Sequence, residues 1–348
     1  MRLLSFIFLT MAGGVCHAQT TTANASRPVQ VYILLGQSNM VGLGKVTGPD
    51  GSLDFAVKTK KKYPYLIDAA GNWAERPDVR HVRVMVGRNG GMQLFNNEFL
   101  KVGGKTLGPE YGIGHPLGDA VEAPLVLLKS CIGNRSLGWD LLPPGSERYV
   151  FESKVYAGYK DRPDAWPVDA AKGTATVPAP WVDKAGKPID WYAGKQYDDD
   201  IANAKKVLAE LGKYYPGATR YEVAGFFFWQ GEKDVGNAGH AAKYEENLVR
   251  FIKYLRKDFD APNAKFVLAT LGEATKGSTG NGGKILEAQL AVDGGSGRYP
   301  EFKGNVATVY AHPLSKGGSG NSHYNGNAET YMAVGEAMGQ AMVGLLKQ

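Results

Sequence analysis

Several residue types that take part in acyl transfer follow apolar segments of the sequence. A serine stands in Gly-Gln-Ser-Asn at positions 36–39, directly after an apolar run, and His312 and His323 follow the last such run. A serine hydroxyl is a weak nucleophile at neutral pH, so it needs an imidazole to accept its proton and a further group to orient that imidazole. Preorganised amides must also stabilise the oxyanion that forms. The residue types are therefore those of a serine-dependent acyl transfer.

The apolar runs are predicted to be strands that are buried on both faces, because they lack the alternation of a half-exposed strand. They cover residues 29–35, 81–86, 123–129, 222–229, 265–271 and 306–310. Helical apolar patterns lie between them, from Asp198 to a predicted stop at Gly212, over 244–255 and over 331–345. Strands that alternate with helices predict the α/β class, with a three-layer α/β/α sandwich around a mostly parallel sheet.

Ligands of such sheets bind at the carboxyl ends of the strands, so the residues after each strand form a candidate site. Those residues are Gln37, Ser38 and Asn39 after the first run, Gly133, Asn134 and Arg135 after the third, Gln230, Gly231, Glu232 and Asp234 after the fourth, and His312 and His323 after the last. His323 is favoured over His312 as the base, because the ring of Pro313 restricts the backbone of His312.

Three sequence blocks occur in the order of a known family. Gly-Gln-Ser-Asn at 36–39, Trp-Gln-Gly-Glu at 229–232 and Ser-His-Tyr-Asn-Gly at 322–326 resemble the SGNH-hydrolase superfamily. Within it, the chain is most similar to the sialate O-acetylesterase-like group, which is related to the acetylxylan esterases of carbohydrate esterase family six. The resemblance implies a flavodoxin-like sandwich and hydrolysis of acetyl esters on sugars, with no cofactor and no metal.

The resemblance also implies roles for individual residues. Ser38 is expected to be the nucleophile and His323 the base. The oxyanion hole is expected to consist of the backbone N–H groups of Ser38 and Gly133 and of one amide side chain, with Gln230 as the first choice and Asn134 as the second.

The acid of the site departs from the common SGNH pattern. Many SGNH enzymes have an aspartate three residues before the catalytic histidine, where this chain has Gly320. Esterases of family six resemble this sequence in using the glutamate of the Gln-Gly-Glu block, which points to Glu232. Asp234 is held in reserve, and a Ser-His dyad whose imidazole is held by a backbone carbonyl stays open.

The length of 348 residues fits one domain with insertions. Residues 1–18 have the pattern of a secretory signal peptide, with cleavage expected near Ala18, and residues 19–28 are expected to be a linker. The esterase domain is expected over 29–348, with an insertion at about 143–196 whose aromatic residues either stack on sugar rings or pin the loop to the core. The protein is therefore expected to be secreted or periplasmic, without a membrane span.

Composition also limits the partners. The net charge is +6, but the basic residues are dispersed apart from Lys58–Lys62, and no nucleic-acid-binding motif accompanies them. Cys131 is expected to be a small buried residue rather than a nucleophile.

The alternative function is a catalytically weak or inactive carbohydrate-binding protein on the same scaffold. The acetylated sugar stays open between sialic acid, xylan and other polysaccharides.

Overall fold

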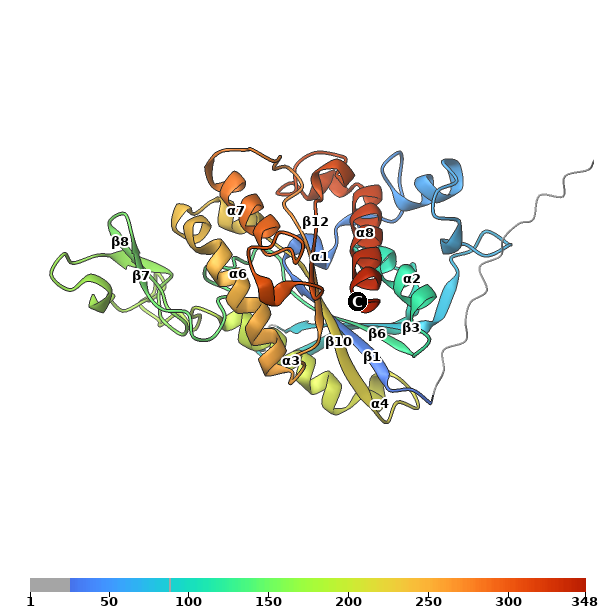
Figure 1. The fold of residues 1–348 in the computed structure, drawn as a ribbon, viewed down its shortest axis with the longest axis horizontal. Coiled ribbons are helices and arrows are strands. Elements are labelled where there is room, and N and C mark those ends of the chain that lie inside the picture. The colour runs from blue at the N-terminus through green and yellow to red at the C-terminus, as the bar shows by residue number, and fades with distance from the viewer. Residues whose placement is uncertain (1–25, 88) are drawn as a thin grey trace, which may run out of the picture.

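A seven-stranded sheet forms the centre of the protein in the computed structural model, which describes residues 26–87 and 89–348 (Figure 1). In spatial order its strands are Val306–Val309 (β12), Lys265–Ala269 (β11), Tyr221–Trp229 (β10), Val29–Gly36 (β1), Leu125–Ser130 (β6), Glu75–Val86 (β3) and Met92–Lys101 (β4). Neighbouring strands are parallel, except that β4 pairs with β3 in the antiparallel sense. Strand β1 lies between β6 and β10, so the strand order reverses there and a ligand site is expected at its carboxyl end.

Helices cover both faces of this sheet (Figure 1). One layer contains Lys195–Ala209 (α3), Ala238–Asp258 (α6) and Gly280–Ala291 (α7), and the other contains Glu110–Ala120 (α2) and Ala328–Leu346 (α8). Three short α-helices, among the described residues, are Ser38–Val41 (α1), Leu211–Tyr214 (α4) and Glu232–Val235 (α5). This arrangement confirms the predicted three-layer α/β/α sandwich.

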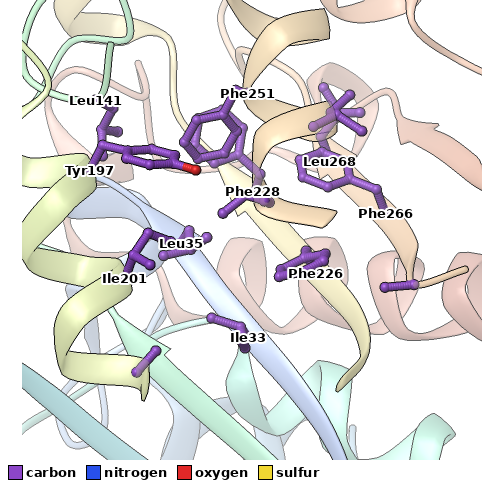
Figure 2. Packing of buried hydrophobic residues seen from close by; sticks show 14 of the residues in the cluster. Ile33, Leu35, Leu141, Tyr197, Ile201, Phe226, Phe228, Phe251, Phe266 and Leu268 are labelled. Atoms are coloured by element: carbon purple, nitrogen blue, oxygen red, sulfur yellow. The ribbon is translucent and has the colours of Figure 1, made fainter. Parts of the chain in front are cut away.

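The two layers explain why the central strands are mostly apolar on both faces. In β1, Ile33 and Leu35 pack into the layer of α3, α6 and α7, whereas Tyr32 and Leu34 face the layer of α2 and α8. Figure 2 shows Ile33 and Leu35 among the aromatic side chains of the first of these layers. Full burial of one such side chain contributes about 1.5–3 kcal/mol, so both faces of the sheet stabilise the fold.

All six predicted strands are present, but two details of the prediction are wrong. Strand β4 was not predicted, because its sequence, Met-Gln-Leu-Phe-Asn-Asn-Glu-Phe-Leu-Lys, combines apolar and polar residues without the continuous run of a central strand. Helix α3 begins at Lys195 and ends at Ala209, and Gly212 lies inside α4 instead of ending α3. The non-helical Glu210, with φ of −121°, separates the two helices.

Apart from the start of β3 at Glu75 and of α3 at Lys195, the segments 44–80 and 143–196 contain only short elements. Residues 44–80 include Gly44–Lys45 (β2), which pairs with Thr106–Leu107 (β5), and the short helices Phe55–Thr59 (η1) and Pro64–Leu66 (η2). Residues 143–196 include a small antiparallel sheet of Tyr149–Phe151 (β7), Lys154–Tyr156 (β8) and Ala165–Pro167 (β9), and the turn Gly173–Ala175 (η3). Three further short helices are Pro300–Phe302 (η4), His312–Leu314 (η5) and His323–Gly326 (η6).

The aromatic residues of this second segment pack against one another and against Trp139, which precedes the segment. Trp166 forms a buried cluster with Trp139, and Trp181 and Trp191 pack against that cluster. The small sheet projects from the sandwich, as the position of β7 and β8 in Figure 1 shows. The packing therefore favours the interpretation that these aromatic residues pin the loop.

The predicted signal peptide, residues 1–18, and most of the predicted linker, residues 19–28, lie outside the described residues. Across 26–87 and 89–348, none of the helices combines the length and the hydropathy that a bilayer span requires.

Candidate active site

Ser38 lies at the carboxyl end of the central strand, where the backbone makes a sharp exit. Gly36 ends β1 with φ of +143°, and a Cβ atom at this position would lie 2.3 Å from the carbonyl oxygen of Trp229 in the neighbouring strand. Only glycine fits both the backbone conformation and the close approach. The chain then begins α1 at Ser38, which is half-buried.

His323 contacts Ser38 from a distant part of the chain. The Oγ atom of Ser38 lies 2.9 Å from Nε2 of His323, so the hydroxyl can donate its hydrogen bond to the imidazole. This is the distance that a general base requires for abstracting the serine proton. The structure thus brings together the two residues that were predicted as nucleophile and base.

The turn that carries His323 has an unusual backbone. His323, Tyr324 and Asn325 have φ values of 55°, 52° and 51°, a left-handed conformation that non-glycine residues adopt only when their surroundings hold them there. The buried Tyr324 provides one anchor, because its ring stacks on that of Trp229 with 5.9 Å between the centroids. The core therefore holds the turn that presents His323.

Glu232 lies in the same region and is bound to the two neighbours of Ser38. Its Oε1 atom accepts a hydrogen bond of 2.7 Å from Nδ2 of Asn39, and its Oε2 atom accepts one from Nε2 of Gln37. Burial raises the pKa of Glu232 to about 7, and the charge of Glu273 acts in the same direction. Within the described part of the chain, no hydrogen bond or ion pair joins Glu232 to His323.

Asp234, the reserve acid, has hydrogen-bond partners other than His323. Its side chain is fully buried and accepts hydrogen bonds from the backbone N–H groups of Leu137 and Gly138, at 2.9 and 2.8 Å. The amide of Gln230 donates to the same carboxylate at 2.6 Å. Asp234 therefore holds the loop that follows β6, and Gly133 and Asn134 belong to that loop.

The structure corrects the first choice for the oxyanion side chain. Gln230 is fully buried, and its Nε2 atom donates to the carbonyl oxygen of Arg135 at 2.9 Å and to Asp234. Its Oε1 atom accepts from the hydroxyl of Tyr244. With its polar atoms bonded inside the core, Gln230 has no donor left for a substrate.

Gly133 and Asn134 are placed beside Ser38. A Cβ atom at Gly133 would lie 3.4 Å from Cβ of Ser38, so this loop passes directly alongside the nucleophile. Asn134 is exposed, and in the part of the chain that the structure describes its side chain makes no hydrogen bond. Its amide is therefore available to a ligand.

These residues surround a cavity of about 780 Å³. Its lining consists of Gln37, Ser38, Leu43, Gly133, Asn134, Glu232, Lys233, Val235, Gly236, Glu273, Gly320, Asn321 and His323. The volume lies within the range of small-molecule sites. The aromatic segment 143–196 contributes no residue to this lining, so the expectation that its aromatic residues stack on a sugar here has no support.

Glu273 is a residue of this cavity that sequence reasoning missed. It follows β11, and its exposed side chain accepts a hydrogen bond of 2.8 Å from the backbone N–H of Gly320. The rule that located the other residues, a polar side chain directly after a buried strand, would have located Glu273 if it had been applied to the run at 265–271.

The surroundings of His312 and Cys131 exclude these residues as the base and the nucleophile of the site. The Nδ1–H group of His312 donates to the carbonyl oxygen of Gly272 at 2.8 Å, and His312 does not line the cavity. Cys131 is buried, and burial raises the pKa of its thiol to about 12, so the thiolate is absent near neutral pH. Among the described residues, no group of three or more His, Cys, Asp or Glu side chains is arranged to hold a metal ion.

Comparison with known proteins identifies the family. The profile of the family described as carbohydrate esterase, sialic acid-specific acetylesterase, matches residues 168–344, slightly more than half of the chain. The chain belongs to this family. The matched part of this carbohydrate esterase includes Glu232 and His323, whereas Ser38 precedes it. A search of curated proteins found no match.

Solved structures are similar to this esterase at low identity. A protein from Arabidopsis thaliana is 17% identical, with 91% of this chain and 98% of that chain covered and a TM-score of 0.49. A carbohydrate acetylesterase from Xanthomonas citri is 14% identical, with 90% and 55% covered and a TM-score of 0.46, so this chain spans just over half of its length. NanS is 13% identical, with 81% and 78% covered and a TM-score of 0.41.

Proposed function

We propose that the protein is a serine esterase that removes acetyl groups from carbohydrate hydroxyls through an acetyl-Ser38 intermediate. The observation that carries the proposal is the 2.9 Å contact between Oγ of Ser38 and Nε2 of His323 at the wall of a cavity that can hold a sugar. Membership of the carbohydrate esterase family supports an acetylated sugar as the substrate.

In the first half of the reaction, His323 accepts the hydroxyl proton as Oγ of Ser38 forms a bond to the acetyl carbonyl carbon. The carbonyl oxygen becomes an oxyanion, which the backbone N–H groups of Ser38 and Gly133 and the side chain of Asn134 stabilise. The bond to the sugar oxygen then breaks, and His323 returns the proton to that oxygen. The products are the free sugar hydroxyl and acetyl-Ser38.

In the second half, His323 takes a proton from water as the water oxygen forms a bond to the acetyl carbon. The bond between that carbon and Oγ of Ser38 then breaks, His323 returns the proton to Oγ, and acetic acid leaves and ionises to acetate. Glu232 remains our choice for the acid. Its contribution is to hold Gln37 and Asn39 on either side of Ser38 and to place a negative charge near the imidazolium that forms.

The proposal also covers the location of the protein, its domain organisation and its substrate. An N-terminal signal at residues 1–18, followed by a linker at 19–28, would direct the esterase domain of residues 29–348 to the outside of the cell or the periplasm. The 143–196 segment is an insertion in that domain, and its contacts support a structural role there. Acetylated sialic acid is the first substrate to test, because the family is sialic acid-specific by description, and acetylxylan is the second.

Acetate release tests this proposal. Wild type and Ser38→Ala are incubated with O-acetylated sialic acid, acetylxylan and the small esters p-nitrophenyl acetate and octanoate, and Ser296→Ala, which changes an exposed serine outside the cavity, serves as the matched control. Wild type and the control should release acetate in preference to octanoate, and Ser38→Ala should release almost none. Binding of the sugars without acetate release would instead support the inactive carbohydrate-binding protein.

A further inference from the structure

The peptide groups around Gly320 connect three separate parts of the candidate site. The N–H of Gly320 donates to Oε2 of Glu273 at 2.8 Å. Its carbonyl oxygen accepts from the backbone N–H of His323 at 3.0 Å and from Nδ2 of Asn39 at 3.1 Å. This glycine therefore links the loop after β11, the turn that carries the imidazole and the turn that carries Ser38.

Two carboxylates leave no room for a side chain at position 320. A Cβ atom on Gly320 would lie 2.6 Å from Oε1 of Glu232 and 2.6 Å from Oε2 of Glu273, closer than van der Waals contact allows. Glu232 begins α5 after β10, Glu273 lies in the loop after β11, and their carboxylates meet at the position three residues before His323. These two carboxylates thus occupy the space that a side chain of residue 320 would need.

We propose that Glu273 is a positioning residue of the esterase: it holds the Gly320–His323 turn so that the imidazole stays on Ser38, and it places a second carboxylate beside Glu232. This inference rests on the proposed function for its catalytic consequence. The proposed role of the Glu273 carboxylate is exerted through the N–H of Gly320, which is its hydrogen-bond partner.

The position of the Glu273 carboxylate beside Glu232 has an electrostatic consequence. The groups that face or surround Glu232 are Glu273 from the loop after β11, His323 and Tyr324 from η6, Tyr331 from α8, Tyr244 from α6, and Lys233 and Asp234 beside it in α5. Burial and the like charge of Glu273 both raise the pKa of Glu232. Removal of the Glu273 charge should therefore lower that pKa and keep Glu232 ionised at lower pH.

The test compares two substitutions of Glu273 with an exposed glutamate on α7 as the control. Glu273→Ala removes the acceptor for the N–H of Gly320, and kcat for acetate release should fall about tenfold with a smaller change in KM, because the hydrogen bond that holds the turn is lost. Glu273→Gln keeps an acceptor oxygen and should restore kcat to within about threefold of wild type. Glu287→Ala should leave both constants unchanged.

The pH profile separates a positioning role from a general loss of structure. In Glu273→Gln, the acid limb of kcat/KM should move to lower pH by about one unit, the size expected for a partly screened charge at close range. An acid limb that stays in place, or wild-type kcat in Glu273→Ala, would overturn the inference.

Amide hydrogen exchange makes the test independent of catalysis. Peptides that cover 319–324 should lose protection in Glu273→Ala and keep it in Glu273→Gln, with the rest of the protein unchanged. Equal protection in wild type and Glu273→Ala would overturn the positioning role. Normal exchange effects in a protein without esterase activity would refute the proposed function and the catalytic consequence of Glu273, while the structural role of Glu273 would stand.

Discussion

Glu232→Gln should change the pH dependence of stability in a direction that the structure determines. The side chain is buried, and its pKa is raised to about 7 from the ordinary value of 4.5. The folded protein therefore binds a proton at Glu232 between these two values, whereas the unfolded chain has released it. In wild type, this group lowers the free energy of unfolding as the pH rises from 4.5 to 7.

The size of the effect follows from the difference between the two pKa values. Each unit corresponds to about 1.4 kcal/mol, so Glu232 destabilises the folded state by about 3 kcal/mol above pH 7, when it is ionised in both states. A glutamine resembles the protonated carboxyl group and does not titrate. The stability of the variant relative to wild type should therefore rise by about 3 kcal/mol between pH 4.5 and pH 8, on top of a pH-independent difference from the altered hydrogen bonds to Gln37 and Asn39.

Equilibrium unfolding in urea at a series of pH values measures this difference. Other groups also titrate in this range, and the difference between variant and wild type cancels their contributions. Glu287→Gln, on the exposed face of α7, should follow the wild-type curve at all pH values. A difference between Glu232→Gln and wild type that does not change with pH would refute the argument that burial perturbs this carboxyl group.

Three further substitutions test the surroundings of Ser38. Asn134→Ala should lower kcat about 100-fold with little change in KM, measured by steady-state acetate release; a wild-type kcat would remove Asn134 from the oxyanion hole. Asp234→Asn replaces an acceptor of two backbone N–H groups in the loop after β6 and should lower the free energy of unfolding by about 2 kcal/mol in urea titrations, so an unchanged midpoint would contradict its anchoring role. Gly36→Ala would place a Cβ atom 2.3 Å from the carbonyl oxygen of Trp229 and should destabilise the protein by about 3 kcal/mol; normal thermal stability would show that the strand exit is more tolerant than the structure indicates.

The sequence predicted the sheet well because its central strands are buried on both faces. The parts 31–35 and 226–229 of two of these strands are apolar without interruption, as expected for strands that are covered on both faces. Strand β4 lacked that signal, because it lies at the edge of the sheet that the described residues form and several of its side chains are exposed.

The pairing of Ser38 with His323 was predictable because both follow strands whose carboxyl ends meet at one edge of the sheet. The position of a residue after a strand does not predict in which direction its amide or carboxylate side chain points. Gln230 follows a central strand as the rule requires, yet its amide binds Asp234 and the carbonyl oxygen of Arg135. Glu232 likewise lines the cavity but binds Gln37 and Asn39. The partner that such a side chain binds depends on which hydrogen-bonding groups lie nearby, and the packing of the folded chain determines the positions of those groups.

The central claim is that Ser38 is the nucleophile, and active-site labelling tests it most directly. The protein is treated with a fluorophosphonate, digested, and mapped by mass spectrometry, with His323→Ala as a second sample. The account predicts one phosphonyl group on the peptide that contains Ser38 in wild type, and strongly reduced labelling when His323 cannot accept the proton. Labelling at another residue, or no labelling in a sample that releases acetate, would contradict the account.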